Sequence, residues 1–242
     1  MIRRHTFSVR GKRSVKRRNI TGRARKSRWQ QRGSSLPPVP TSPTWWFVEK
    51  VVYINLDDRK DRKREIEQEL SVFPKEKTVR LSAKTDTRNG HYGCSKSHIA
   101  ALEMAIHHNW KNVLIMEDDA TWSNYEKGYS LLEKLASKPY DVITLGNIRT
   151  DYDPNTYKLK EGQTTTAYLV SQHYYPTLLK NFKDGFAMLE STRDEAKYCL
   201  DQYWKVLQKT DNWFVVHPSL CIQRKGISSI CGTEVNYRSY FN

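Results

Sequence analysis

The chain has few cysteines, no long apolar run and, in its first 43 residues, no acidic side chain. Its four cysteines, Cys94, Cys199, Cys221 and Cys231, form no CxxC pair, which favours reduced thiols over a disulfide framework, although Cys221 and Cys231 could still pair. No stretch approaches the length needed to cross a bilayer, and the start of the sequence lacks the apolar segment of a secretory signal. We therefore expect a cytoplasmic protein.

Positive charge is concentrated at one end of the sequence. The formal net charge is +15, yet residues 1–43 hold 13 Lys or Arg, so the rest of the chain has 28 basic and 26 acidic residues. Such a charged segment, poor in apolar side chains, cannot bury enough surface to offset the entropy lost on ordering. We predict a disordered tail over residues 1–43 and one domain over residues 44–242. The tail could bind an anionic partner (nucleic acid or a membrane surface), act in targeting, or have no specific partner.

Strand-like and helix-like segments alternate after the tail. Apolar runs predict strands over residues 47–56, 77–83, 112–116, 140–146, 164–171 and 212–218, and helical spacing predicts helices over residues 59–71, 95–109, 125–137 and 194–208. Thr192 and Glu195 form a capping-box pattern before the last helix. This alternation favours an α/β fold with a mainly parallel central sheet flanked by helices. Ligands of such sheets bind at the carboxyl ends of the strands.

Three carboxylates follow the strand at residues 112–116 without a spacer. The stretch NVLIMEDDAT places Glu117, Asp118 and Asp119 at the edge of the sheet where a ligand is expected. Clustered carboxylates repel one another unless a hard divalent cation neutralises them, and such a cation can also bind a diphosphate. We therefore predict a Mn²⁺ or Mg²⁺ site. The simpler interpretation is that these acids cap a helix starting near Asn124.

Several stretches resemble glycosyltransferase family 25, which includes bacterial lipooligosaccharide sugar transferases and collagen galactosyltransferases. The similarity covers about residues 51–230, and its parts follow the family's order: VVYINLDDRKDRKRE, VRLSAKTD, GCSKSHIAALEMAI, VLIMEDDA, TAYLVSQHYYPTLL, YCLDQYWK and HPSLCIQRKGISSI. The resemblance implies a GT-A-like fold, Mn²⁺ or Mg²⁺, and an inverting glycosyltransferase. Galactose or a related hexose would pass from a nucleotide-sugar donor, typically linked to uridine diphosphate, to a glycan or glycoprotein acceptor.

The strand ends and the resemblance together suggest donor-binding and metal-binding residues. We expect Asp119 to bind the metal, with Glu117 or Asp118 at the ribose hydroxyls or in the metal shell. Asn55 and Leu56 end the first strand, where the base and ribose would lie.

Basic and imidazole side chains extend this set. Arg59 and Arg62 could pair with a diphosphate through bidentate contacts, or could lie on a solvated helix face. Ser97 and His98 resemble the family's Ser-His pair near the donor, although His98 could instead be an imidazole at the edge of the core. Zinc binding through Cys94 and His98, one helical turn apart, is conceivable, but the sequence shows no second ligand pair at a suitable spacing.

Inverting transfer needs a base that takes the proton of the acceptor hydroxyl. Asp201 is the candidate, because it lies beside the apolar stripe of the predicted helix and matches an acid in the family's C-terminal region. A surface ion pair with Lys197 or Lys205 is the alternative. His217 could be a metal or phosphate ligand, or an ordinary residue at a strand end.

Two other functions stay open. The protein could bind nucleic acid through the basic tail and carry an inactive transferase-like domain, although the intact acidic cluster argues against inactivity. It could also be a nucleotide-sugar hydrolase or another nucleotidyl enzyme. A transferase should release nucleotide faster when its acceptor is present, which distinguishes these functions.

Overall fold

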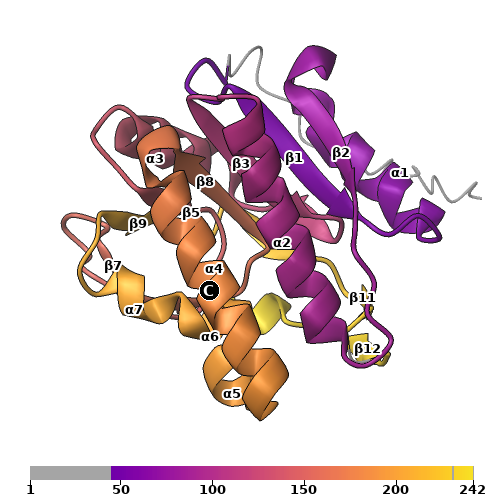
Figure 1. Ribbon diagram of the computed structural model, residues 1–242. Coiled ribbons are helices and arrows are strands. Elements are labelled where there is room, and N and C mark those ends of the chain that lie inside the picture. Colours follow the sequence, from indigo (N-terminus) through magenta and orange to yellow (C-terminus); the bar gives the residue numbers. More distant parts are fainter. Residues whose placement is uncertain (1–44, 231, 242) are drawn as a thin grey trace, which may run out of the picture. The chain divides into compact units, whose positions relative to one another are not determined.

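A six-stranded sheet lies at the centre of the computed structural model, which describes residues 45–230 and 232–241 (Figure 1). The strand order is β2-β1-β3-β8-β5-β9, formed by β1 Lys50–Asn55, β2 Thr78–Ser82, β3 Asn112–Glu117, β5 Val142–Thr144, β8 Ala167–Ser171 and β9 Trp213–Val215. β8 runs antiparallel to both of its neighbours, and the other adjacent pairs are parallel. The predicted α/β fold with a mainly parallel sheet is confirmed, and the predicted tail lies outside the described residues.

Helices pack on both faces of this sheet. The long helices are α1 Lys60–Glu69, α2 Gly90–His107, α3 Tyr125–Ala136 and α4 Tyr175–Thr192. α2 and α4 lie side by side over one face (Figure 1), in one apolar cluster with Val52 and Ile115, whereas α1 and α3 share the other cluster with Val51 and Leu114. The two faces are sorted in this way because successive residues of a strand point to opposite sides. Within the described residues, no helix is both long and apolar enough to cross a membrane.

Short strand pairs and turns complete the described part. The pairs are β4 Ala120–Trp122 with β10 Cys221–Gln223, β6 Ile148–Tyr152 with β7 Leu159–Gln163, and β11 Gly226–Ile227 with β12 Glu234–Val235. The 3₁₀ turns are η1 Leu70–Val72, η2 Lys75–Lys77, η3 Gln172–Tyr174 and η4 Arg238–Tyr240. The β4–β10 pair holds the C-terminal segment against the acidic turn, where Arg224 N donates to Asp119 O over 2.7 Å.

Two predicted helices have different ends in the structure. α2 begins five residues before the predicted start, because the Asn89 side chain caps it by accepting a hydrogen bond from His91 N. The helix predicted over residues 194–208 is three short helices, α5 Glu195–Tyr198, α6 Leu200–Tyr203 and α7 Lys205–Gln208. The chain breaks between α5 and α6 because Cys199 has an extended ψ of 148°.

Two predictions about helix caps are wrong: the capping box of Thr192 and Glu195, and the role of the three acids as a cap of the helix that starts near Asn124. Asp194 is the N-cap of α5 and makes no side-chain cap hydrogen bond, and Glu195 instead accepts a hydrogen bond from the side chain of Asn89. Thr192 Oγ1 donates to a backbone carbonyl of α4, so it is not part of a capping box. α3 begins after Asn124 without any side-chain cap, so the three acids do not serve that helix.

Candidate active site

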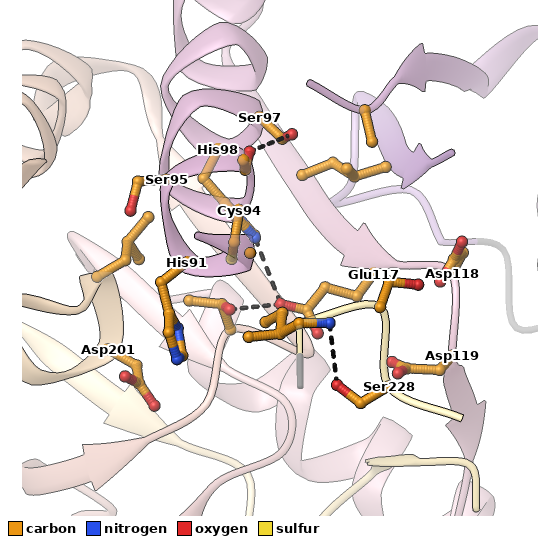
Figure 2. A pocket seen from close by; sticks show the side chains of 18 of the residues that line it. His91, Cys94, Ser95, Ser97, His98, Glu117, Asp118, Asp119, Asp201 and Ser228 are labelled. Carbon is orange, nitrogen blue, oxygen red and sulfur yellow. Dashed lines mark hydrogen bonds and ion pairs between the residues drawn. The ribbon is translucent and has the colours of Figure 1, made fainter. Parts of the chain in front are cut away.

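A cavity of about 490 Å³ opens at the carboxyl ends of β1, β2 and β3, as expected for a sheet of this class. Its walls come from the strand ends, the first turns of α2, the residues before β8, the α5–α6 junction and the segment around β11 and β12. In Figure 2, Asp118 and Asp119 lie at one side of the cavity, Asp201 lies at the other, and Glu117 lies between them. One cavity therefore brings together the acidic turn after β3 and the separate carboxylate of Asp201.

Glu117 is held by three neighbouring side chains. Its Oε1 accepts a hydrogen bond from Thr165 Oγ1 over 2.5 Å and lies 3.4 Å from His98 Nε2, and its Oε2 accepts from Gln223 Nε2 over 3.2 Å. Burial acts to raise the pKa of Glu117, but the hydrogen bond and charge of His98 and the other hydrogen bonds outweigh it and leave this pKa below its usual value. Glu117 is thus a carboxylate with both oxygens engaged.

Arg62 supplies the positive charge that balances the other two acids. Its Nη1 donates to Asp118 Oδ1 over 3.0 Å and to Asp119 Oδ2 over 3.1 Å, and its Nη2 donates to Ile227 O over 2.7 Å. The side chain is only 8% exposed, so the interpretation of Arg62 as a solvated helix residue is wrong. Asp118 has both oxygens occupied, because Asn55 Nδ2 donates to its Oδ2 over 2.8 Å. The protein therefore neutralises part of the acidic cluster with its own guanidinium.

Asp119 keeps one open oxygen. Its Oδ1 is buried and has no hydrogen-bond partner among the described residues. Burial, together with the charge of Glu117, raises the pKa of Asp119 to about 7. A buried carboxylate oxygen without a partner is costly unless something binds it, so Oδ1 is the atom of the cluster that best fits an incoming cation.

The residues at the end of β1 have different roles. Leu56 lines the cavity, which is consistent with the prediction that it binds the donor. Asn55 is buried and does not line the cavity, because its amide group donates to Asp118 and to Arg59 O and accepts from Arg80 Nε. Asn55 therefore positions Asp118, and its contact with the donor base stays a prediction.

Arg59 lies outside the main cavity. It pairs with Asp61 through contacts of 2.9 to 3.3 Å and donates to Ser229 Oγ over 3.2 Å. It lines a second cavity of about 450 Å³ that shares Arg62 and Asp119 with the first. A diphosphate in the main cavity would therefore meet Arg62 before Arg59.

Ser97 and His98 both line the main cavity, but their polar atoms already have partners. Ser97 Oγ donates to Gly93 O over 2.7 Å and accepts from Lys84 N over 2.8 Å, which ties α2 to the segment after β2. His98 is 1% exposed, and its Nδ1 lies 2.8 Å from Tyr168 Oη. Its Nε2 remains directed at Glu117.

Asp201 lines the cavity at the start of α6. Its Oδ2 accepts a hydrogen bond from Thr164 N over 3.0 Å, and its Oδ1 accepts from Gln202 Nε2 over 3.2 Å. Burial raises the pKa of Asp201 above its usual value. The alternative ion pair with Lys205 is not formed, because Lys205 Nζ bonds Glu161 Oε1 over 2.9 Å.

Two expectations near Asp201 and β9 are not supported. The predicted helix with one continuous apolar stripe is not formed: the chain breaks at Cys199, and Ala196 is exposed whereas Leu200 is buried. His217 does not line the cavity; its ring packs on Tyr152 with 4.9 Å between centroids, and a cis peptide bond joins it to Pro218. The structure therefore does not bring His217 to the acids as a metal or phosphate ligand.

The sequence did not predict the side chains that hold Glu117. It also did not predict that the C-terminal segment lines the cavity. Thr165 precedes β8 and Gln223 ends β10, and neither has a local pattern that marks it. The contact of Gln223 depends on the pairing of β4 with β10, and the contact of Thr165 depends on the antiparallel position of β8 beside β3. No short motif predicts either pairing. Ser228 and Tyr237, from the C-terminal segment, also line the cavity.

A family model described as "Glycosyltransferase family 25 (LPS biosynthesis protein)" matches residues 75–192. This match supports a glycosyltransferase. The match also confirms the resemblance to family 25 over residues 75–192. The matched range contains the acidic cluster and His98, and it ends before Asp201.

Two solved structures show low similarity to the chain. One is a mannose-1-phosphate geranyltransferase from Thermus thermophilus, with 11% identity and a TM-score of 0.42 over 70% of this chain and 73% of that chain. The other is a glycosyltransferase involved in the glycosylation of the major capsid of PBCV-1, with 10% identity and a TM-score of 0.40 over 72% of this chain and 92% of that chain. Similarities this low add nothing to the functional assignment. No curated protein matches the chain.

Proposed function

We propose that this glycosyltransferase moves a hexose, galactose or a close relative, from a uridine-diphosphate-linked donor to a hydroxyl of a glycan or protein-linked acceptor. The observation that supports this proposal best is one cavity, at the strand ends, that contains an acidic turn, a buried arginine and a separate carboxylate at Asp201. The family 25 match includes the acidic turn, and the sequence resemblance implies the donor class.

A divalent cation fits the acidic turn through Asp119. Mg²⁺ and Mn²⁺ take oxygen ligands and usually combine one or two carboxylates with water and substrate phosphates. Asp119 Oδ1 is the open oxygen, whereas the oxygens of Asp118 and Glu117 are occupied by protein donors. When bound, the cation would neutralise charge on a diphosphate.

Arg62 prepares the cavity for an anion. Its guanidinium holds Asp118 and Asp119 in place and also lines both cavities. The guanidinium offsets part of the negative charge of these two acids, which would otherwise repel phosphate oxygens strongly in a partly enclosed cavity, because water screens charges less there. The donor diphosphate is therefore expected on the Arg62 side and the sugar toward Asp201.

Asp201 is the proposed base. The acceptor oxygen attacks the anomeric carbon in line, its proton passes to the carboxylate of Asp201, and the bond between the anomeric carbon and the diphosphate oxygen breaks, so the configuration inverts. Burial raises the pKa of Asp201, which brings a carboxylate closer to the range in which a base is effective. The hydrogen bond from Thr164 N fixes one oxygen and leaves the carboxylate oriented in the cavity wall.

Product analysis tests this function. The protein is incubated with Mn²⁺, a panel of uridine-diphosphate sugars and a panel of glycan acceptors, and free nucleotide and glycosylated product are both measured. Acceptor-dependent nucleotide release with product of inverted configuration supports the proposal. Nucleotide release that no acceptor accelerates, with no glycosylated product, would favour a nucleotide-sugar hydrolase.

A further inference from the structure

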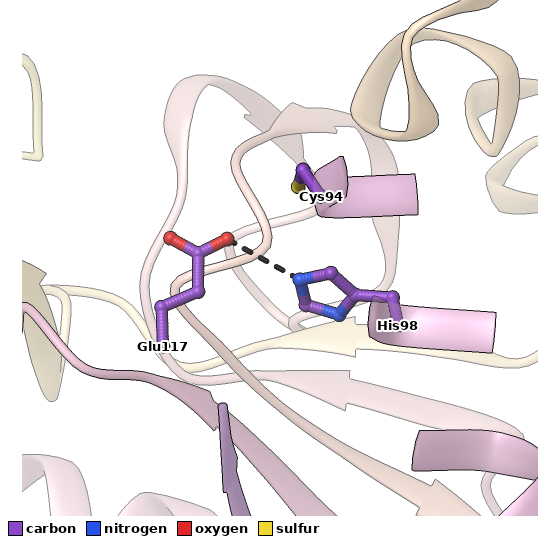
Figure 3. A group of neighbouring side chains, drawn as sticks. All are labelled: Cys94, His98 and Glu117. Atoms are coloured by element: carbon purple, nitrogen blue, oxygen red, sulfur yellow. Dashed lines mark ion pairs between the residues drawn. The ribbon is translucent and has the colours of Figure 1, made fainter. Parts of the chain in front are cut away.

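Three potential metal ligands of different chemistry meet in the cavity wall. Cys94 and His98 lie one turn apart on α2, and both approach Glu117 at the end of β3 (Figure 3). The Cys94 thiol, one imidazole nitrogen and one carboxylate oxygen all lie within 4.8 Å of one another. The sequence already suggested the Cys94–His98 pair, and the fold adds the third ligand that the sequence could not show.

We propose that Cys94, His98 and Glu117 form a zinc-binding site. Thiolate, imidazole and carboxylate are the three side-chain groups that bind Zn²⁺ in proteins, and three protein ligands with one position open to solvent is a recurring zinc arrangement. A thiolate among the ligands disfavours Mg²⁺ and Mn²⁺, which prefer oxygen. All three residues line the main cavity, so water or another small ligand in the cavity would supply the fourth ligand.

The spacing of the ligand atoms is close to what zinc requires. His98 Nε2 and Glu117 Oε1 are 3.4 Å apart, which is long for a hydrogen bond. Two ligands about 2.0–2.1 Å from a tetrahedral Zn²⁺ are themselves about 3.4 Å apart. The thiol sulfur needs a separation of about 3.6 Å from the other two atoms. Because all three atoms lie within 4.8 Å of one another, the sulfur must move closer by at most about 1.2 Å.

His98 is already oriented as a zinc ligand. Its Nδ1 lies 2.8 Å from Tyr168 Oη, and the two rings stack with 5.7 Å between centroids. Metal-binding histidines nearly always use their second ring nitrogen in such a hydrogen bond, because it fixes the tautomer and the ring plane. To bind zinc, His98 would keep its proton on Nδ1, toward Tyr168, and Nε2 would exchange its proton and its contact with Glu117 for the metal.

The charges of the site also suit Zn²⁺. A Cys94 thiolate and a Glu117 carboxylate together carry two negative charges, so the loaded site is formally neutral inside a wall where His98 is almost fully buried. Binding releases the thiol proton to solvent, and zinc affinity should therefore rise with pH. At Glu117 Oε1 the zinc ion would replace the contact with His98 Nε2, and the hydrogen bond from Thr165 would remain. The proposed Mn²⁺ or Mg²⁺ position instead uses the unpartnered oxygen of Asp119.

Cobalt binding tests the proposal directly. The full-length protein is stripped with a chelator and titrated with Co²⁺, whose thiolate complexes absorb in the near ultraviolet, and Zn²⁺ then displaces it. We expect a thiolate band that saturates at one Co²⁺ per chain, is lost when Zn²⁺ is added, and persists in a large excess of Mg²⁺, which would occupy the Asp119 position instead. Cys94→Ser should remove the band and weaken zinc binding by on the order of a hundredfold or more.

Cys199→Ser is the matched control, because Cys199 lines the same cavity but is not among the three ligands, and it should keep the band. A wild-type protein without the band, or a band that persists in Cys94→Ser, would overturn the proposal. If circular dichroism shows that Cys94→Ser is misfolded, Glu117→Gln decides: unchanged zinc affinity in that variant also overturns it. No nucleotide sugar is used, so this outcome is independent of the proposed transferase function.

Discussion

Asp119 and Asp201 are carboxylates of one cavity whose surroundings suit different tasks. Asp119 has an oxygen without a partner among the described residues, and Asp201 accepts hydrogen bonds on both oxygens at the opposite side. Asp119→Asn removes the proposed metal ligand, so donor binding should no longer depend on Mn²⁺ or Mg²⁺, while the fold is kept. Calorimetric donor titration with and without Mn²⁺ measures this. A variant that keeps metal-dependent donor binding would exclude Asp119 as the ligand.

Asp201→Asn should affect the chemical step and spare donor binding. A base acts when the acceptor proton is transferred, and general-base catalysis typically contributes about 10²–10⁴-fold. We expect kcat to fall on the order of a hundredfold or more, with unchanged metal-dependent donor affinity. Transfer assays and donor titration on the same protein check both halves. Near-normal transfer contradicts the base role, whereas lost donor affinity would place Asp201 in the donor-binding set.

At the scale of elements, Arg62 is a buried polar link between α1 and the end of β3. Removing one partner of a buried ion pair leaves an uncompensated charge and costs about 3–5 kcal/mol. Arg62→Ala should therefore lower the free energy of unfolding by about that amount. Arg59→Ala is the matched control, because its pair with the exposed Asp61 is worth at most about 1 kcal/mol. Urea denaturation of both variants measures the difference, and equal losses would contradict the buried pair.

The same elements show what the sequence can predict. The strands of the sheet were predictable because apolar runs such as residues 113–116 are buried on both faces, and the place of the acids followed from the rule about strand ends. The burial of Arg62 and the hydrogen bond from Thr165 to Glu117 were not predictable. Both join segments far apart in the chain, 56 and 48 residues in these cases, and no local periodicity reports such contacts.

The ends of two helices were predicted wrongly for a related reason. The Asn89 cap extends α2 by five residues, and that added turn carries Cys94 into the cavity wall. The helix predicted around Asp201 breaks at Cys199, which places Asp201 in the first turn of a new short helix. In both places a single backbone conformation decides whether a side chain reaches the cavity, and helical spacing alone cannot detect it.

At the scale of the whole molecule, the charge of the chain divides into two parts with separate expected roles. Residues 1–43 carry 13 basic and no acidic residues, whereas the remainder is nearly balanced. Because the tail sequence offers no apolar pattern for a core, a protein that starts at Thr44 should keep its melting temperature and its donor turnover.

Any affinity for anionic vesicles or DNA should be lost when the tail is removed. In the full chain this affinity should fall steeply with salt, since it would depend on phosphate neutralisation. Thermal melts, donor turnover and binding at two salt concentrations, compared between the two chains, check this. A lower melting temperature or lost turnover in the shortened protein would mean that the tail contributes to the folded enzyme, and salt-independent binding would rule out a simple electrostatic arm.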